Sequence, residues 1–190
     1  MGDTPTFPNW FEGQQYNFEE QLTRFKGLPD LRFLQIGAYT GDATVWLLDN
    51  ILTDQSSVLT DIDTWEGSDE KEHHSMDFNE VYDYYRSRTS KYPNLNAIQD
   101  SSKSVLPTLD PGFNFIYVDG DHTESAVYWD AIDSWELLAS GGIIAFDDYQ
   151  WGQDVHPSLR PKLAIDQFMG EKQGEYEVLV NNYQMWLLKK

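Results

Sequence analysis

The strongest constraint on the fold is an alternation of short apolar runs with segments of helical periodicity. The runs occupy residues 32–36, 58–62, 94–99, 113–118 and 143–146. Between them apolar residues recur every three or four positions, as in Val45, Leu48 and Leu52, which predicts helices. Strands separated by helices form parallel sheets covered on both faces. The sequence therefore predicts an α/β fold with a doubly wound, mostly parallel sheet.

The two ends of the chain complete this prediction. Residues 14–26 have helical spacing and are followed by Gly27, a residue typical of helix ends. After a further helix at 162–169, two β-type segments at 176–180 and 184–188 flank a short turn. We therefore expect a seven-stranded sheet that ends in an antiparallel hairpin.

Charge and composition exclude several classes of partner. The 190 residues suit one domain, and 13 basic against 32 acidic residues give a net charge of −19. Such a surface repels phosphate backbones and anionic lipid, so we expect neither nucleic acid nor membrane as a partner. The chain has no cysteine and no basic segment followed by an apolar leader, which favours a cytoplasmic protein. A homodimer is left open.

A glycine turn and a later aspartate suggest a nucleoside ligand. The turn at 37–41 follows the first apolar run, and Asp63 ends the second run about 20 residues later, a spacing at which a carboxylate reaches ribose hydroxyls. Ala38 and Tyr39 stand where a pyrophosphate would need a second glycine, which argues against a nicotinamide dinucleotide and an oxidoreductase. Tight packing of strand against helix is the alternative reading of the turn.

Four sequence blocks resemble class I S-adenosylmethionine-dependent methyltransferases. The blocks are FLQIGAYTG at 33–41, DTWEG at 63–67, FIYVDGDH at 115–122 and LLASGGIIAFDDY at 137–149. They most resemble the small group related to macrocin-type sugar O-methyltransferases and, more distantly, catechol O-methyltransferase. The resemblance implies a Rossmann-like methyltransferase domain at 31–190, with the arm and helix at 1–30 belonging to the same domain.

The resemblance also implies where the cofactor binds. Gly37 and Gly41 would border its methionine part, Asp63 would hold the ribose, and the Asp100–Ser101 pair would meet the adenine edge. The expected cofactor-binding set is Gln35, Gly37, Ala38, Tyr39, Gly41, Asp63, Thr64, Trp65, Asp100, Ser101 and Asp119. Trp65 is expected near the ribose or adenine, or else in the core. We expect Asp63→Ala to weaken cofactor binding and to spare folding.

One position departs from the family pattern. Many relatives carry a carboxylate in the first strand where this chain has Gln35. Glutamine can orient a water or the cofactor amine, but without charge. This departure keeps open the alternative of a catalytically inactive binding or regulatory module.

Three further aspartates suggest a metal site. Asp119, Asp147 and Asp148 follow strands expected to be neighbours, where their carboxylates would repel one another unless a hard cation such as Mg²⁺ neutralised them. Matching positions bind metal in the O-methyltransferases that the sequence resembles. Alternatively, Asp147 caps the turn and Asp148 is solvated. Asp121 competes with Asp119 as a ligand.

The predicted reaction is methyl transfer from S-adenosylmethionine to a hydroxyl oxygen of a small molecule. His122 is the preferred general base because imidazole accepts protons near neutral pH, and Asp119 is the other candidate. The charged segment 68–74 is expected to be a lid, and Asp130 is expected on the surface. Sugars, catechol-like phenols and other hydroxylated metabolites are all candidate acceptors.

Overall fold

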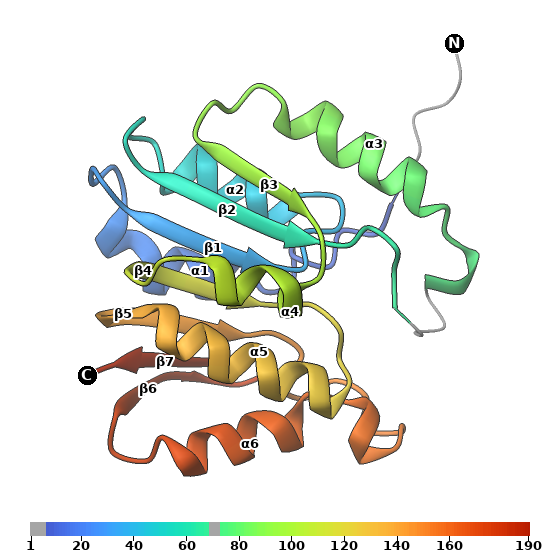
Figure 1. Cartoon of the computed structure of the whole chain (residues 1–190), viewed down its shortest axis with the longest axis vertical. Coiled ribbons are helices and arrows are strands. Elements are labelled where there is room, and N and C mark those ends of the chain that lie inside the picture. Colours follow the sequence, from blue (N-terminus) through green and yellow to red (C-terminus); the bar gives the residue numbers. More distant parts are fainter. Residues whose placement is uncertain (1–6, 69–72) are drawn as a thin grey trace.

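The computed structural model describes residues 7–68 and 73–190 and contains a seven-stranded sheet of order β3-β2-β1-β4-β5-β7-β6 (Figure 1). The strands are β1 Arg32–Ile36, β2 Val58–Asp63, β3 Leu95–Gln99, β4 Phe113–Val118, β5 Leu138–Phe146, β6 Tyr176–Asn181 and β7 Met185–Lys189. Strands β1 to β5 pair in parallel, and β7 pairs antiparallel with both β5 and β6. The predicted sheet and its C-terminal hairpin are confirmed.

Helices cover both faces of this sheet. They are α1 Gln15–Leu22, α2 Asp42–Asn50, α3 Phe78–Thr89, α4 Ser102–Val105, α5 Glu124–Leu137 and α6 Lys162–Glu171. Figure 1 shows α4, α5 and α6 in front of the sheet, with α1 and α2 behind it. The front core includes Trp135 and Phe168, and the rear core includes Phe18 and Leu47. None of the helices that the structure describes is both long and apolar enough to cross a membrane.

Two segments differ from the sequence prediction or lie outside the description. The strand predicted at 143–146 begins earlier, at Leu138, because α5 passes directly into extended backbone there (ψ 130°). Gly141 has φ 78°, so a glycine interrupts the regular strand geometry. Most of the predicted lid, residues 69–72, lies outside the described residues.

The carboxyl ends of the parallel strands converge at β1 and β4. At Gly37 (φ 83°), an added Cβ would lie 1.9 Å from the backbone oxygen of Asp119. Only glycine permits this approach, since any side chain would separate the two strand ends. The turn after β1 and the loop after β4 therefore meet directly, and both open onto the same edge of the sheet.

Candidate functional site

A cavity of about 330 Å³ lies at the carboxyl ends of β1, β2, β3 and β4. Its volume is within the range of small-molecule sites in proteins. Six of the predicted cofactor-binding residues line it: Gly37, Asp63, Thr64, Asp100, Ser101 and Asp119. We call this space the first cavity.

The backbone fixes the Asp63 carboxylate beside the first cavity. Its Oδ2 accepts hydrogen bonds from the N–H groups of Ala38 (2.7 Å) and Tyr39 (2.8 Å), and its Oδ1 accepts one from Trp65 N–H (2.7 Å). A carboxylate can accept about four hydrogen bonds, so a ligand hydroxyl can still be accommodated. Asp63 thus joins the glycine turn to β2 as well as facing the cavity.

The other predicted cofactor residues shape the turn from outside the cavity. The Gln35 amide nitrogen donates to the backbone oxygen of Gly37 (2.8 Å), and the Trp65 indole donates to that of Tyr39 (2.9 Å). Trp65 is buried against the ring of Tyr85. Gly41 (φ 80°) also lies beside the Tyr85 ring, because a Cβ added at Gly41 would be 2.9 Å from it. Gln35, Ala38, Tyr39, Gly41 and Trp65 therefore do not line the first cavity.

A second cavity of about 390 Å³ adjoins the first. It is lined by Trp10, Gln14, Asp119, His122, Asp147, Asp148, Trp151 and Tyr183. Asp119 belongs to the walls of both cavities. Aromatic rings and carboxylates form most of the second cavity, and no Lys or Arg of the described residues, 7–68 and 73–190, is among its lining residues.

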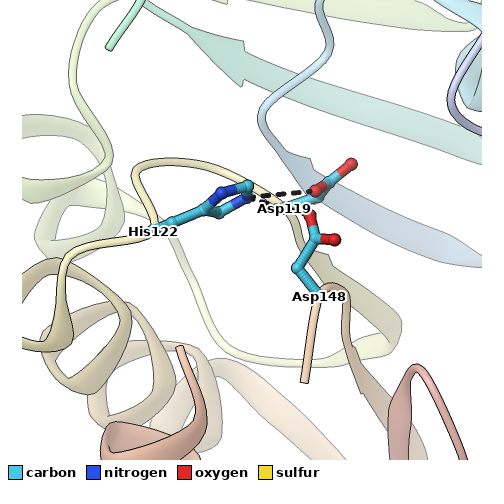
Figure 2. Close-up of side chains that lie close together, drawn as sticks. All are labelled: Asp119, His122 and Asp148. Carbon is cyan, nitrogen blue, oxygen red and sulfur yellow. Dashed lines mark ion pairs between the residues drawn. The ribbon is translucent and has the colours of Figure 1, made fainter. Parts of the chain in front are cut away.

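Asp119, His122 and Asp148 gather at one wall of the second cavity, and Figure 2 shows the imidazole directed at the two carboxylates. His122 Nε2 lies 3.1 Å from Asp148 Oδ2 and 3.9 Å from Asp119 Oδ1. One ligand atom from each residue can be chosen so that all three lie within 4.8 Å of one another. The pKa of Asp119 is raised well above its ordinary value, mainly by burial and secondly by the negative charge of Asp147.

Asp147 lies next to this cluster but is held by other groups. The Tyr117 hydroxyl donates to its Oδ2, while Gln184 Nε2 (3.1 Å) and the N–H of Asp148 (2.8 Å) donate to its Oδ1. Burial is the main cause that raises the pKa of Asp147 to about 6. Asp148 has φ 54°, an uncommon conformation for a residue with a side chain, so its bond to Asp147 helps to hold a strained turn.

The hydrogen bonds of Asp147 continue to the N-terminal helix. Gln184 Oε1 accepts from Asn17 Nδ2 on α1 (2.8 Å) and from the Trp186 indole (2.8 Å). Sequence reasoning missed Tyr117, Asn17 and Gln184, because nothing in the local pattern distinguishes them from other polar residues in a core. His122, predicted as a base, is the third member of the cluster, and Asp147 is adjacent to it.

The structure also decides where two other aspartates, Asp121 and Asp130, lie relative to the cavities. Asp121 is exposed, and its Oδ1 accepts from Thr123 N–H (2.8 Å) at the start of α5. It lines the first cavity but not the second, so Asp119 rather than Asp121 belongs to the cluster. The expectation that Asp130 lies on the surface is wrong: its exposed fraction is 5%, and it lines the first cavity.

A family model described as "Methyltransferase domain" matches residues 34–149. The chain belongs to this family. That match runs from within β1 to just beyond β5 and includes Gly37, Asp63 and the Asp119, His122 and Asp148 cluster. Family and fold together identify the chain as a member of the S-adenosylmethionine-dependent methyltransferases of class I.

Solved structures share the fold at low sequence identity. The O-methyltransferase TomG of Streptomyces achromogenes, in complex with S-adenosylmethionine, is 15% identical and has a TM-score of 0.64, covering 100% of this chain and 84% of that one. An O-methyltransferase of Bacillus cereus, bound to S-adenosylhomocysteine, is 16% identical with a TM-score of 0.62, covering 99% and 84%. At these identities the likeness establishes the fold.

One relative was found by sequence. An uncharacterised protein of Acanthamoeba polyphaga mimivirus is 32% identical over 78 residues, which is 40% of this chain and 35% of that protein. The match thus spans about a third of the relative's length. It adds no information about substrate.

Proposed function

We propose that this chain transfers the methyl group of S-adenosylmethionine to a hydroxyl oxygen of a small molecule, assisted by a divalent cation. The observation that carries the proposal is the position of Asp119, in the walls of both cavities. Methyl transfer needs a donor and an acceptor that meet in line at one point. Two adjoining cavities with a common wall supply that arrangement.

The first cavity suits the donor. Asp63 retains acceptor capacity for a ribose hydroxyl, and the glycine turn lets a ligand approach the backbone at Gly37. S-adenosylmethionine supplies an electrophilic methyl group on its sulfonium. Because the acceptor must reach that methyl, we place the sulfonium end toward Asp119 and the second cavity.

The residues of the second cavity fit a divalent cation. Asp119 and Asp148 present hard oxygen ligands close together, and burial and the neighbouring negative charges disfavour the charged form of Asp119 when nothing neutralises it. A cation such as Mg²⁺ would supply positive charge that orients the hydroxyl and makes it more acidic. Asp147, also predicted as a ligand, is assigned instead to holding Asp148, because the ligand atoms that lie within 4.8 Å of one another belong to Asp119, His122 and Asp148.

We assign His122 to proton acceptance. His122 lines the second cavity, and its Nε2 lies 3.1 Å from Asp148 Oδ2. The carboxylate of Asp148 would stabilise the imidazole once it has accepted a proton. Trp10 and Trp151 line the same cavity and would exclude water from the reacting atoms. The charge pattern argues against a phosphorylated acceptor, because among the described residues three aspartates and neither Lys nor Arg line this space.

The sequence blocks also resemble macrocin-type sugar O-methyltransferases, so sugar hydroxyls belong among the acceptors to be tested beside phenols. The main alternative to this function is a catalytically inactive binding module, which Gln35 suggested. In the structure Gln35 supports the turn through the Gly37 carbonyl rather than lining the first cavity, so its lack of charge leaves the cavity wall unchanged.

Calorimetric titration with S-adenosylmethionine, followed by mass spectrometry of hydroxylated acceptors incubated with the protein and Mg²⁺, tests the proposal. We expect cofactor binding, and a mass gain of one methyl group on at least one acceptor that is lost with EDTA. Asp119→Asn should retain the fold and lose the transfer. Absence of cofactor binding would overturn the proposal, and binding without transfer to any acceptor would favour the inactive module.

A further inference from the structure

Asp130 places a buried carboxylate in the wall of the first cavity. It lies on α5, is 5% exposed, and lines the cavity together with Ser102, Gly120 and Ala126. A Cβ added at Gly120 would stand 3.7 Å from Asp130 Oδ2. The missing side chain at Gly120 therefore leaves this carboxylate open toward the cavity.

The protein provides little compensation for this buried charge. No ion pair to Asp130 is found within residues 7–68 and 73–190, and the charged neighbours that act on it, Asp121 and Asp133, are both negative. Burial is the main cause that raises the pKa of Asp130 to about 6, and the Ser102 hydroxyl opposes this shift only in part. A buried carboxylate without a cationic partner is costly unless a ligand donates to it.

The geometry of the two cavities fixes which part of the donor would lie there. The sulfonium end must face Asp119, where the second cavity begins, and Asp63 takes the ribose in the middle. Ser101, Ser102 and Asp130 line the first cavity and not the second, so they are among the residues left for the adenine. On its pairing edge adenine carries an exocyclic amine, which is a hydrogen-bond donor, whereas hypoxanthine carries a carbonyl oxygen there.

We propose that Asp130 is a cofactor-binding residue that accepts a hydrogen bond from the exocyclic amine of the cofactor's adenine and so selects adenine over its deaminated form. This inference rests on the proposed function, since it requires S-adenosylmethionine in the first cavity. It assigns to α5 a part of cofactor recognition that the strand-end residues Asp100 and Ser101 do not provide alone.

The test compares binding of S-adenosylhomocysteine and S-inosylhomocysteine, which differ in that exocyclic group, by calorimetric titration. We expect the unmodified protein to bind the adenosyl compound about 10- to 100-fold more tightly, as for a charge-assisted hydrogen bond. Asp130→Asn should narrow or reverse this preference, because the asparagine amide can donate to the inosine carbonyl. The matched control is Asp133→Asn, one turn along α5, which should keep the full preference.

The outcomes separate the two proposals. If the unmodified protein binds neither compound, the proposed function fails and this inference fails with it. If it binds both compounds equally, or if Asp130→Asn keeps the preference of the unmodified protein, only the role of Asp130 is overturned. If Asp130→Asn does not fold, the affinities of the unmodified protein for the adenosyl and inosyl compounds can still be compared, and equal affinities would overturn the role of Asp130.

Discussion

Asp63 in the first cavity and the Asp119 and Asp148 pair in the second are held in opposite ways. In the first, three backbone N–H groups bind Asp63, which therefore has its partners before any ligand arrives. In the second, Asp119 and Asp148 face each other and His122, and the pKa of Asp119 is raised by burial and by neighbouring negative charge. A carboxylate bound by backbone amides is a fixed hydrogen-bond acceptor. Two carboxylates close together repel each other, and a bound cation would relieve this repulsion.

The largest expected effect concerns His122. Replacement by glutamine removes the proton acceptor and should lower the rate of methyl transfer by about 100- to 10 000-fold. Cofactor affinity should stay unchanged, since His122 does not line the first cavity. Single-turnover kinetics and calorimetric titration measure the two quantities. If Mg²⁺ affinity falls along with the rate, His122 is a metal ligand and not the base.

The next prediction concerns the cation. At a hundred times its dissociation constant, Mg²⁺ should stabilise the protein by about 2.7 kcal/mol, seen as a higher melting temperature that EDTA reverses. Asp119→Asn combined with Asp148→Asn should abolish this gain. Asp110→Asn, an exposed change, is the control at equal ionic strength, because ions also screen a chain of charge −19. An equal gain in all three proteins would leave screening as its only cause.

Asp63→Ala should act on binding and on folding together. Loss of a charged acceptor should weaken S-adenosylmethionine binding by about 2 kcal/mol. The sequence alone suggested that folding would be spared, but three backbone N–H groups lose their acceptor, so unfolding by urea should show a loss of about 1 to 2 kcal/mol. Weakened binding with unchanged stability would mean that the turn holds without Asp63.

The smallest effect concerns Asp61, a fully buried carboxylate that has no backbone amide and no cationic side chain as a partner within the described part of the chain. Its Oδ2 accepts from Thr44 (2.6 Å) and Tyr85 (2.7 Å), and burial raises its pKa to about 7. This folded-state pKa exceeds the unfolded value near 3.9, so between these two values the folded state binds more protons than the unfolded state does. The free energy of unfolding should therefore fall as pH rises from about 4 to 7. We expect a slope of about 1 kcal/mol per pH unit near pH 5.5.

Urea unfolding at pH 5 and pH 6 measures this slope. Asp61→Asn keeps a hydrogen-bond acceptor for Thr44 and Tyr85 and should make the slope shallower, whereas Asp110→Asn should leave it unchanged. Asp130 and Asp147 also have raised pKa values, so part of the slope should persist in the variant. An unchanged slope in Asp61→Asn would show that Asp61 does not titrate in this range.

The sequence predicts what local patterns determine. The strands, the glycine turn and the aspartates at strand ends follow from periodicity and spacing, and the topology brings Asp119 and Asp148 together. The direction of a side chain depends on packing that is distant in sequence. Asp147 points toward Tyr117 and Gln184, and Asp130 points inward from a helix whose apolar stripe gave no sign of it.

The hydrogen bonds from Asn17 through Gln184 to Asp147 connect the N-terminal segment to the proposed acceptor site. Trp10 and Gln14 of the same segment line the second cavity, and no residue from 7 to 22 lines the first. With the acceptor in the second cavity, as proposed, we expect substitutions there to alter acceptor preference while donor binding is preserved. On the same proposal, exchanging this segment between relatives should change the range of acceptors, and a fusion joined close to it should disturb the second cavity.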